Sequence, residues 1–223
     1  MDPAADIEQD QRIRLDEIRF LHNICANLSS EDDKSRMRRA MVVMLYSHFE
    51  GFAKFTLEVY RRFVDQSKLK CCEVQPALAT AVLRDLFKAF QNPDGGRSFL
   101  PKELMDAREL RPLAIQRTFV ENAWAFGQRL AAIPDGYVDT ESNLKPVVLR
   151  KNLFRLGLPH DLFDGFEGSI NKLLHYRNSI AHGKRDLAID ERDYDKLFIA
   201  VSEIMDELRR SILKAISTSA FLL

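Results

Sequence analysis

Hydrophobic residues recur along most of the chain at every third or fourth position, which is the spacing of one face of an α-helix. No segment shows the strict alternation expected of a half-buried strand. The longest periodic segment covers about residues 32–66. Its apolar stripe comprises Met37, Met41, Met44, Leu45, His48, Phe52, Phe55, Val59 and Phe63. The pattern predicts an all-α protein with one long helix as a principal bundle member. We interpret His48, within the stripe, as a core histidine.

Glycine and proline clusters separate the periodic segments and set the expected helix boundaries. Pro76 and Pro146 each stand where a proline can open a helix. The expected helices cover about residues 6–28, 32–66, 76–90, 98–110, 118–131, 146–157, 162–181 and 191–218. In the last helix, the residues expected to face the core are Leu197, Val201, Ile204, Leu208 and Ile212.

The helices of the middle part are shorter than those on either side. Helices of this length do not bury a core by themselves. We therefore interpret residues 1–223 as a single domain that carries a helical insertion at about residues 68–145.

Composition narrows the class of protein. Of 223 residues, 46% are hydrophobic and 30% are charged, which is typical of a globular chain. Lys plus Arg equals Asp plus Glu at 33 each, so a nucleic-acid partner must be held by a local patch. No apolar run of about 18 residues predicts a membrane span, and the acidic N-terminus is not a signal peptide. Cys25, Cys71 and Cys72 offer no metal-ligand spacing and favour a reducing, cytoplasmic location. We expect no metal and no cofactor.

Candidate chemistry concentrates in "HYRNSIAHGKRD", residues 175–186. On a helical wheel Arg177 falls in line with apolar residues such as Leu174. A guanidinium there is costly unless it snorkels, reaches an acid or faces a partner chain. A second stripe contains Asn178 and His182, and Gly183 then ends the helix.

Ordinary helix termination is an alternative interpretation of this stretch. Cations suit the negative C-terminal end of a helix, and glycine commonly follows it. Two features favour a functional site instead. One is the arginine within the apolar stripe; the other is the asparagine directly after it, with a His-Gly pair at the end of the penultimate helix.

"RNSIAHG" resembles the R-x4-6-H motif of the HEPN superfamily. "LYSHFEGFAKFTLEVY", residues 45–60, resembles the long-helix signature of its RiboL-PSP-HEPN group. The resemblance covers the long helix and the last two helices. It implies a HEPN-like helical bundle, usually a homodimer and often a metal-independent endoribonuclease. Arg177 and His182 would be catalytic and meet across the dimer interface, with Asn178 supporting them.

The proposed chemistry suits these side chains. Cleaving RNA by its own 2′-hydroxyl needs a base, an acid and stabilisation of a phosphorane. Histidine has an ordinary pKa near 6.5, and arginine gives phosphate two hydrogen bonds from a permanently charged fork. A single His182 cannot readily act on opposite sides of one phosphorus. A two-fold dimer supplies two copies of His182 and Arg177, and it would also explain an arginine in an apolar stripe.

Further residues are candidates for supporting roles. Glu50 and Lys54 are spaced as a helical ion pair, which is often only a surface pair. In the functional interpretation Glu50 orients Arg177 and Lys54 helps to hold phosphate. His175 shares the stripe of His182, and either supports the site or is simply exposed.

Local basic runs are candidates for an RNA-binding groove, although each alone is typical of a solvated face. They comprise residues 34–39, Arg61 with Arg62, residues 149–155, and Lys184 with Arg185. Some HEPN toxins carry a tyrosine two residues after the histidine as a target of modification. Here that position is Lys184, which makes such regulation doubtful.

Three hypotheses follow. The first is a dimeric endoribonuclease that binds RNA and acts as a toxin or anti-phage defence effector, with an antitoxin or other regulatory protein as a possible partner. The second is a non-catalytic HEPN scaffold that binds a protein or nucleotide. The third is a plain helical interaction domain whose resemblance to HEPN proteins is accidental.

Overall fold

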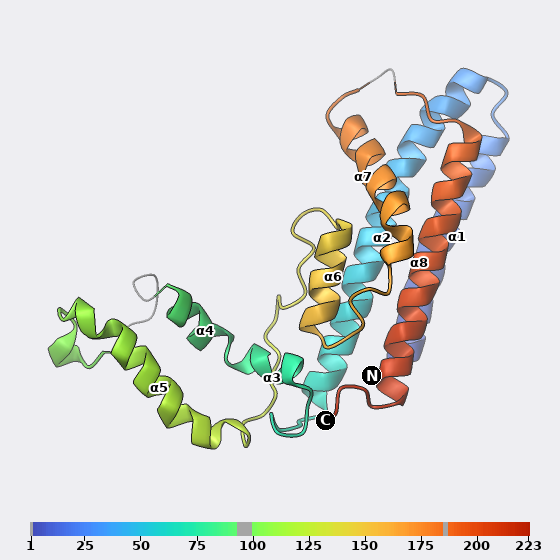
Figure 1. The fold of residues 1–223 in the computed structure, drawn as a ribbon. Coiled ribbons are helices and arrows are strands. Elements are labelled where there is room, and N and C mark those ends of the chain that lie inside the picture. Colours follow the sequence, from blue (N-terminus) through green and yellow to red (C-terminus); the bar gives the residue numbers. More distant parts are fainter. Residues whose placement is uncertain (1, 93–99, 185–186) are drawn as a thin grey trace. The chain divides into compact units, whose positions relative to one another are not determined.

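The computed structural model describes residues 2–92, 100–184 and 187–223. These residues form eight α-helices, three short 3-10 turns and two isolated β-bridges (Figure 1). The all-α prediction is therefore confirmed. No helix of the described residues is both long enough and apolar enough to cross a membrane.

The chain divides into two compact units. Unit 1 comprises Met1–Phe63 with Val138–Ser219, and unit 2 comprises Val64–Tyr137 with Ala220–Leu223. Unit 2 overlaps most of the segment expected as an insertion. The interpretation of that segment as an insertion into a single domain stays a prediction.

Unit 1 contains the long helices α1 (Pro3–Ala26), α2 (Glu31–Gln66, whose last turn belongs to unit 2), α6 (Pro146–Arg155), α7 (Glu167–Ala181) and α8 (Glu191–Ser217). Helix α8 packs against α1 and α7, and α6 packs against α7 (Figure 1). Asp2 and Asp190 begin α1 and α8, because their carboxylates accept hydrogen bonds from free N–H groups of the first turn.

The core of unit 1 is centred on α2 and α8. All five α8 residues expected to face inward are buried. The buried side of α2 differs from the predicted stripe. Four of the nine expected residues are only partly buried: Met37, Met44, Phe55 and Phe63. Residues outside the stripe are buried instead, among them Val42, Tyr46, Phe49 and Leu57. His48 is buried too, as expected.

Unit 2 departs from the predicted helices. The helix expected at 76–90 is two helices, α3 (Pro76–Val82) and α4 (Arg84–Gln91). The helix expected at 98–110 is wrong: its described part contains only 3-10 turns at Lys102–Leu104 and Arg108–Leu110. Helix α5 (Arg111–Phe126) begins earlier than the expected 118–131, since Pro112 suits a first turn. It ends before Leu130, which instead forms an isolated bridge with Lys70.

Candidate functional site

Helix α7 places Arg177 beside the core of unit 1. Ile170, Leu173 and Leu174 are buried along one side of the helix, as the sequence pattern predicts. Arg177 continues this side one turn later and is partly buried. The arginine therefore faces the protein interior at its edge rather than open solvent.

The guanidinium of Arg177 is held by three neighbours. Its Nη1 donates hydrogen bonds to Oδ1 of Asn178, at 2.8 Å, and to Oδ1 of Asn143, at 2.9 Å. Its Cζ lies 4.8 Å from the centroid of the Tyr46 ring, within the range of a cation–π contact. All three neighbours are uncharged. Among the described residues Arg177 has no carboxylate partner, so its charge is not neutralised by an ion pair.

Tyr46 joins this site to the loop before α6. Its side chain is only 1% exposed, and its Oη accepts a hydrogen bond from the Leu144 N–H at 2.7 Å. Burial raises the pKa of the Tyr46 phenol to about 12, and the neighbouring Glu50 carboxylate acts in the same direction. The phenol is therefore neutral at physiological pH, and its oxygen accepts a hydrogen bond from the loop backbone.

Glu50 and Lys54 do not form the expected helical ion pair in the described part of the chain. Glu50 is partly buried one turn after Tyr46 and interacts with its phenol, whereas Lys54 is exposed. The hydrogen bonds of Arg177 go to two asparagines and not to Glu50. The structure thus brings Glu50 near Arg177 through Tyr46, while Lys54 lies on the open side of α2.

His182 is placed by the way α7 ends. Lys184 N–H donates to the Ser179 carbonyl and Gly183 N–H to the Ile180 carbonyl, each at 3.0 Å. This pair of bonds is the Schellman motif, which needs a left-handed residue; Gly183 supplies it with φ of 84°. His182 is the C-cap, and its imidazole is exposed without a hydrogen bond to the described residues.

The remaining predicted site residues lie in the second half of α7 and directly after it. His175 and Lys184 are exposed. Arg39 of α2 donates a hydrogen bond to the Lys184 carbonyl, which ties the segment after α7 to the long helix. Arg185 lies outside the described residues.

Arg177 and His182 are not brought together by α7 itself. Five residues of α-helix turn the chain by about 140° beyond a full turn, so the two side chains leave the helix in different directions. Arg177 points to Tyr46 and Asn143, while His182 is exposed at the end of α7.

Most cations of the expected RNA-binding groove have structural roles instead. Arg38 is only 5% exposed and donates to the Ile189 carbonyl at 2.7 Å. Arg61 is equally buried and pairs with Glu58, and Arg150 pairs with two acids. Arg38 and Arg61 are therefore too deeply buried to line such a groove, whereas the role of the other basic residues in binding RNA stays a prediction.

Two residues of the site were not identified from the sequence. Tyr46 lies within the motif of residues 45–60, but outside the apolar stripe assigned to that helix. Asn143 is 34 residues from Arg177, in a loop without local periodicity. Among the described residues, no three His, Cys, Asp or Glu side chains are grouped as metal ligands would be.

Comparison with known proteins gives one match. A family model described as RiboL-PSP-HEPN matches residues 10–214. No curated protein and no solved structure matches the chain. The matched range contains α2 and α7, and thus every described residue of the candidate site.

Proposed function

Because the chain belongs to the RiboL-PSP-HEPN family, we propose that it is a metal-independent endoribonuclease that works as a homodimer and acts as a toxin or anti-phage defence effector in the cytoplasm. The observation that carries this proposal is the state of Arg177. Its guanidinium is fixed by neutral groups on one nitrogen, and its Nε and Nη2 have no acceptor among the described residues. An arginine held this way offers a charged edge to a phosphate.

The proposed reaction needs only the RNA and two copies of the chain. Arg177 binds the scissile phosphate and stabilises the charge that develops on its oxygens. One His182 removes the proton of the 2′-hydroxyl, whose oxygen then attacks phosphorus. His182 of the second copy donates a proton to the departing 5′-oxygen. The products are a 2′,3′-cyclic phosphate and a free 5′-hydroxyl.

The different directions of Arg177 and His182 support a site made from two chains. A monomer holds its arginine against α2 and leaves its histidine exposed at the end of α7. A second copy related by a two-fold axis brings an additional histidine to the arginine of the first.

The other site residues have supporting roles in this proposal. Asn178 fixes Arg177 directly, and Glu50 acts on it through Tyr46. Lys54, His175 and Lys184 are exposed and are candidates for contacts with the RNA backbone. Arg185 keeps the same predicted role. An antitoxin or other regulatory protein is the expected partner besides RNA.

The test is RNA cleavage by purified protein in the presence of a chelator. Arg177→Ala and His182→Ala should each abolish the activity of the wild type, and the wild-type products should carry a 2′,3′-cyclic phosphate. Arg117→Ala and His160→Ala are matched controls, because both residues are exposed and lie outside the candidate site. Equal degradation of RNA by wild type and His182→Ala would contradict the proposal.

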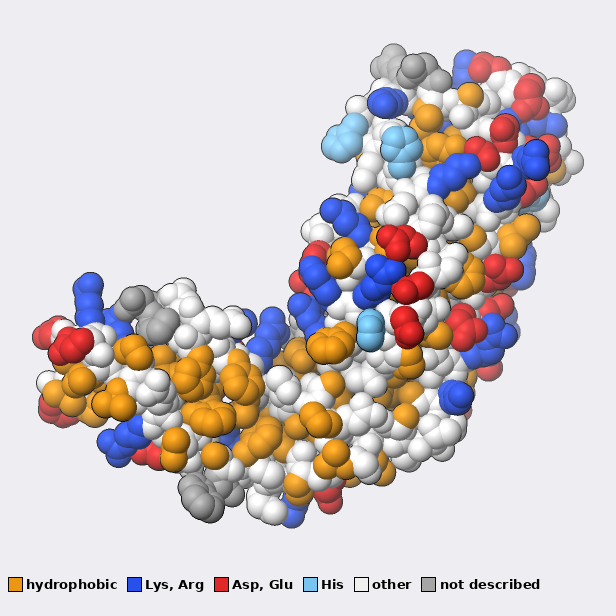
Figure 2. Space-filling model, in the orientation of Figure 1, with side chains coloured by type: hydrophobic (Ala, Val, Ile, Leu, Met, Phe, Trp, Pro, Cys, Tyr) orange, Lys and Arg blue, Asp and Glu red, His pale blue; other side chains and the backbone are white. Residues whose placement is uncertain are grey.

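A non-catalytic scaffold is the second candidate, and unit 2 provides the observation that favours it. Hydrophobic side chains gather on the surface over α4 and α5 (Figure 2). The exposed ones include Phe87, Phe90, Leu113, Phe119 and Val120. A pocket of about 330 Å³ lies beside α5, lined by residues such as Leu104 and Leu110. Absence of cleavage, with partner binding lost in Phe119→Ser, would favour this function.

A further inference from the structure

The loop before α6 determines where the Arg177 guanidinium lies. We propose that Asn143 and Tyr46 are positioning residues of the Arg177 site, and that residues 138–145 form a rigid support for them. The inference rests on the proposed function, because it assigns these residues a role in the same reaction. It adds a loop and a tyrosine to a site that the sequence placed on α7, on the residues directly after it, and on Glu50 and Lys54.

Tyr46 holds Arg177 in two ways. Its ring lies under the guanidinium, with 4.8 Å between Cζ and the ring centroid. Its Oη accepts from the N–H of Leu144, the residue next to the second acceptor of Arg177. One buried side chain therefore fixes both the plane of the guanidinium and the loop that binds its edge.

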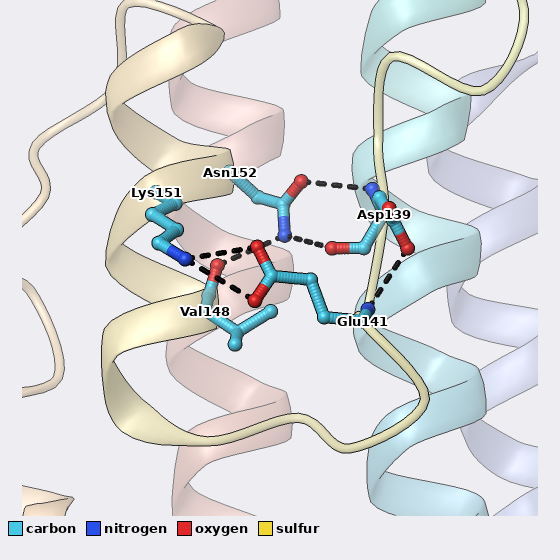
Figure 3. A network of polar contacts seen from close by, with 5 residues as sticks. All are labelled: Asp139, Glu141, Val148, Lys151 and Asn152. Atoms are coloured by element: carbon cyan, nitrogen blue, oxygen red, sulfur yellow. Dashed lines mark hydrogen bonds and ion pairs between the residues drawn. The ribbon is translucent and has the colours of Figure 1, made fainter.

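Asn152 fixes the start of the same loop (Figure 3). This α6 side chain is 1% exposed, and its amide exchanges two hydrogen bonds with the backbone of Asp139, at 2.7 and 3.0 Å. The Asp139 carboxylate in turn accepts from the Glu141 N–H at 2.8 Å. The Glu141–Lys151 ion pair is exposed and adds little.

The backbone directly before Asn143 adopts an uncommon conformation. Glu141 and Ser142 have φ values of 51° and 62°, in the left-handed region that residues with a side chain seldom adopt. Such conformations persist where the surrounding structure dictates them, and they cluster at functional sites. Here they turn the chain so that the amide of Asn143 reaches Arg177.

The chemistry of the supporting groups suits an arginine that must bind phosphate. An aspartate at either asparagine position would hold the guanidinium equally well but would compete with phosphate for its charge. Amide oxygens and an aromatic face restrain it without neutralising it. The loop thus pre-organises the arginine and leaves its charge for the RNA.

The experiment compares Asn143→Ala and Tyr46→Phe with wild type in two measurements. The first is NMR of the Arg177 side-chain N–H groups in the free protein, which reports restricted rotation of the guanidinium. The second is the kinetics of RNA cleavage. Glu141→Gln is the matched control on the same loop. Asn143→Asp keeps an acceptor oxygen and should restore the restricted rotation.

We expect Asn143→Ala to release the guanidinium and to lower kcat roughly 10- to 100-fold with little change in KM, as small misplacements of a catalytic group do. Tyr46→Phe keeps the ring under the guanidinium and removes only the acceptor of the Leu144 N–H, so it should loosen the guanidinium and lower kcat to a smaller extent. Thermal unfolding of each variant shows whether it is folded. If Asn143→Ala does not fold, Tyr46→Phe is used to test the inference. Restricted rotation in wild type that Asn143→Ala leaves unchanged would overturn the inference. Released rotation with unaltered kcat would overturn the role in the reaction. A wild type that does not cleave RNA, yet shows the restricted arginine, would instead reject the proposed function and with it that role.

Discussion

The middle and the end of α7 are built differently. Arg177 is fixed by residues distant in sequence, on α2 and in the loop before α6. His182, five residues later, lies in a helix end formed by backbone hydrogen bonds between residues close in sequence, and its side chain is exposed. One chain thus completes the arginine part of the site and leaves the histidine part open. This difference agrees with the proposed site shared between two chains.

The largest effect is expected from dimers that contain one wild-type chain and one His182→Ala chain, isolated with two different tags. If the acid and the base are the two copies of His182, activity should fall at least about 100-fold, because each such role contributes roughly that much. A mixed dimer with His160→Ala should keep full activity. Retention of half the activity would show that each His182 works in a separate site. The exposed position of His182 would then not reflect a site shared between two chains.

The loop that holds Arg177 can be disrupted independently of His182 by substituting Asn152. Asn152→Leu removes three hydrogen bonds and leaves the Asp139 N–H and carbonyl without their partner. We expect the free energy of unfolding to drop by roughly 2–3 kcal/mol, because three hydrogen bonds are lost and each contributes about 1 kcal/mol. Urea denaturation measures it. Asn27→Leu, at an exposed asparagine with one side-chain hydrogen bond, should change it by well under 1 kcal/mol. Equal effects of the two substitutions would show that the loop is not fixed by Asn152.

Features of the fold that depend on residues close in sequence are the ones that the sequence predicts. Periodicity and caps predict α1, α2 and α8 to within a few residues. All five α8 residues expected to face inward are buried, but Tyr194, Ala200, Met205 and Ala215 are buried as well and were not predicted. Gly183 marks the end of α7 because only the local backbone decides it. The motif "RNSIAHG" is enough to select Arg177, Asn178 and His182 as candidates, whose catalytic role stays a prediction.

Contacts between residues that are distant in the sequence could not be predicted from it. Nothing near Asn143 indicates that it reaches Arg177, and Tyr46 lies off the stripe assigned to its helix. Charge runs mislead for the same reason, since Arg38 donates to the Ile189 carbonyl, which only the fold brings to it. The helices of unit 2 are short, and the sequence there has no long periodic segment. Their boundaries depend on tertiary contacts, which hydrophobic periodicity does not predict.

The local placement of His182 can be tested with two glycines of the same helix. Gly183→Ala should cost about 1 kcal/mol of unfolding free energy, because its φ of 84° is unfavourable for alanine although no atom blocks the methyl group. Gly168→Ala, in the first turn of α7 and also unobstructed, should instead stabilise by up to about 1 kcal/mol. Chemical denaturation gives both values. The same sign for both variants would argue against a Schellman end, and thus against this explanation of where His182 lies.

The smallest effect concerns the other histidine environment, the buried His48 of α2. Its side chain is 8% exposed, and burial lowers its pKa below the ordinary value of 6.5, although the Glu17 carboxylate 3.2 Å from its Nε2 opposes the shift. The unfolded chain then binds a proton near pH 6.5 that the folded chain does not bind, so stability is retained above this pH and falls as the pH is lowered through it. His48→Gln removes this linkage and should flatten the dependence of unfolding free energy on pH between about 7 and 5. An unchanged slope would mean that the pKa of His48 is the same in the folded and the unfolded chain, with Glu17 offsetting the effect of burial.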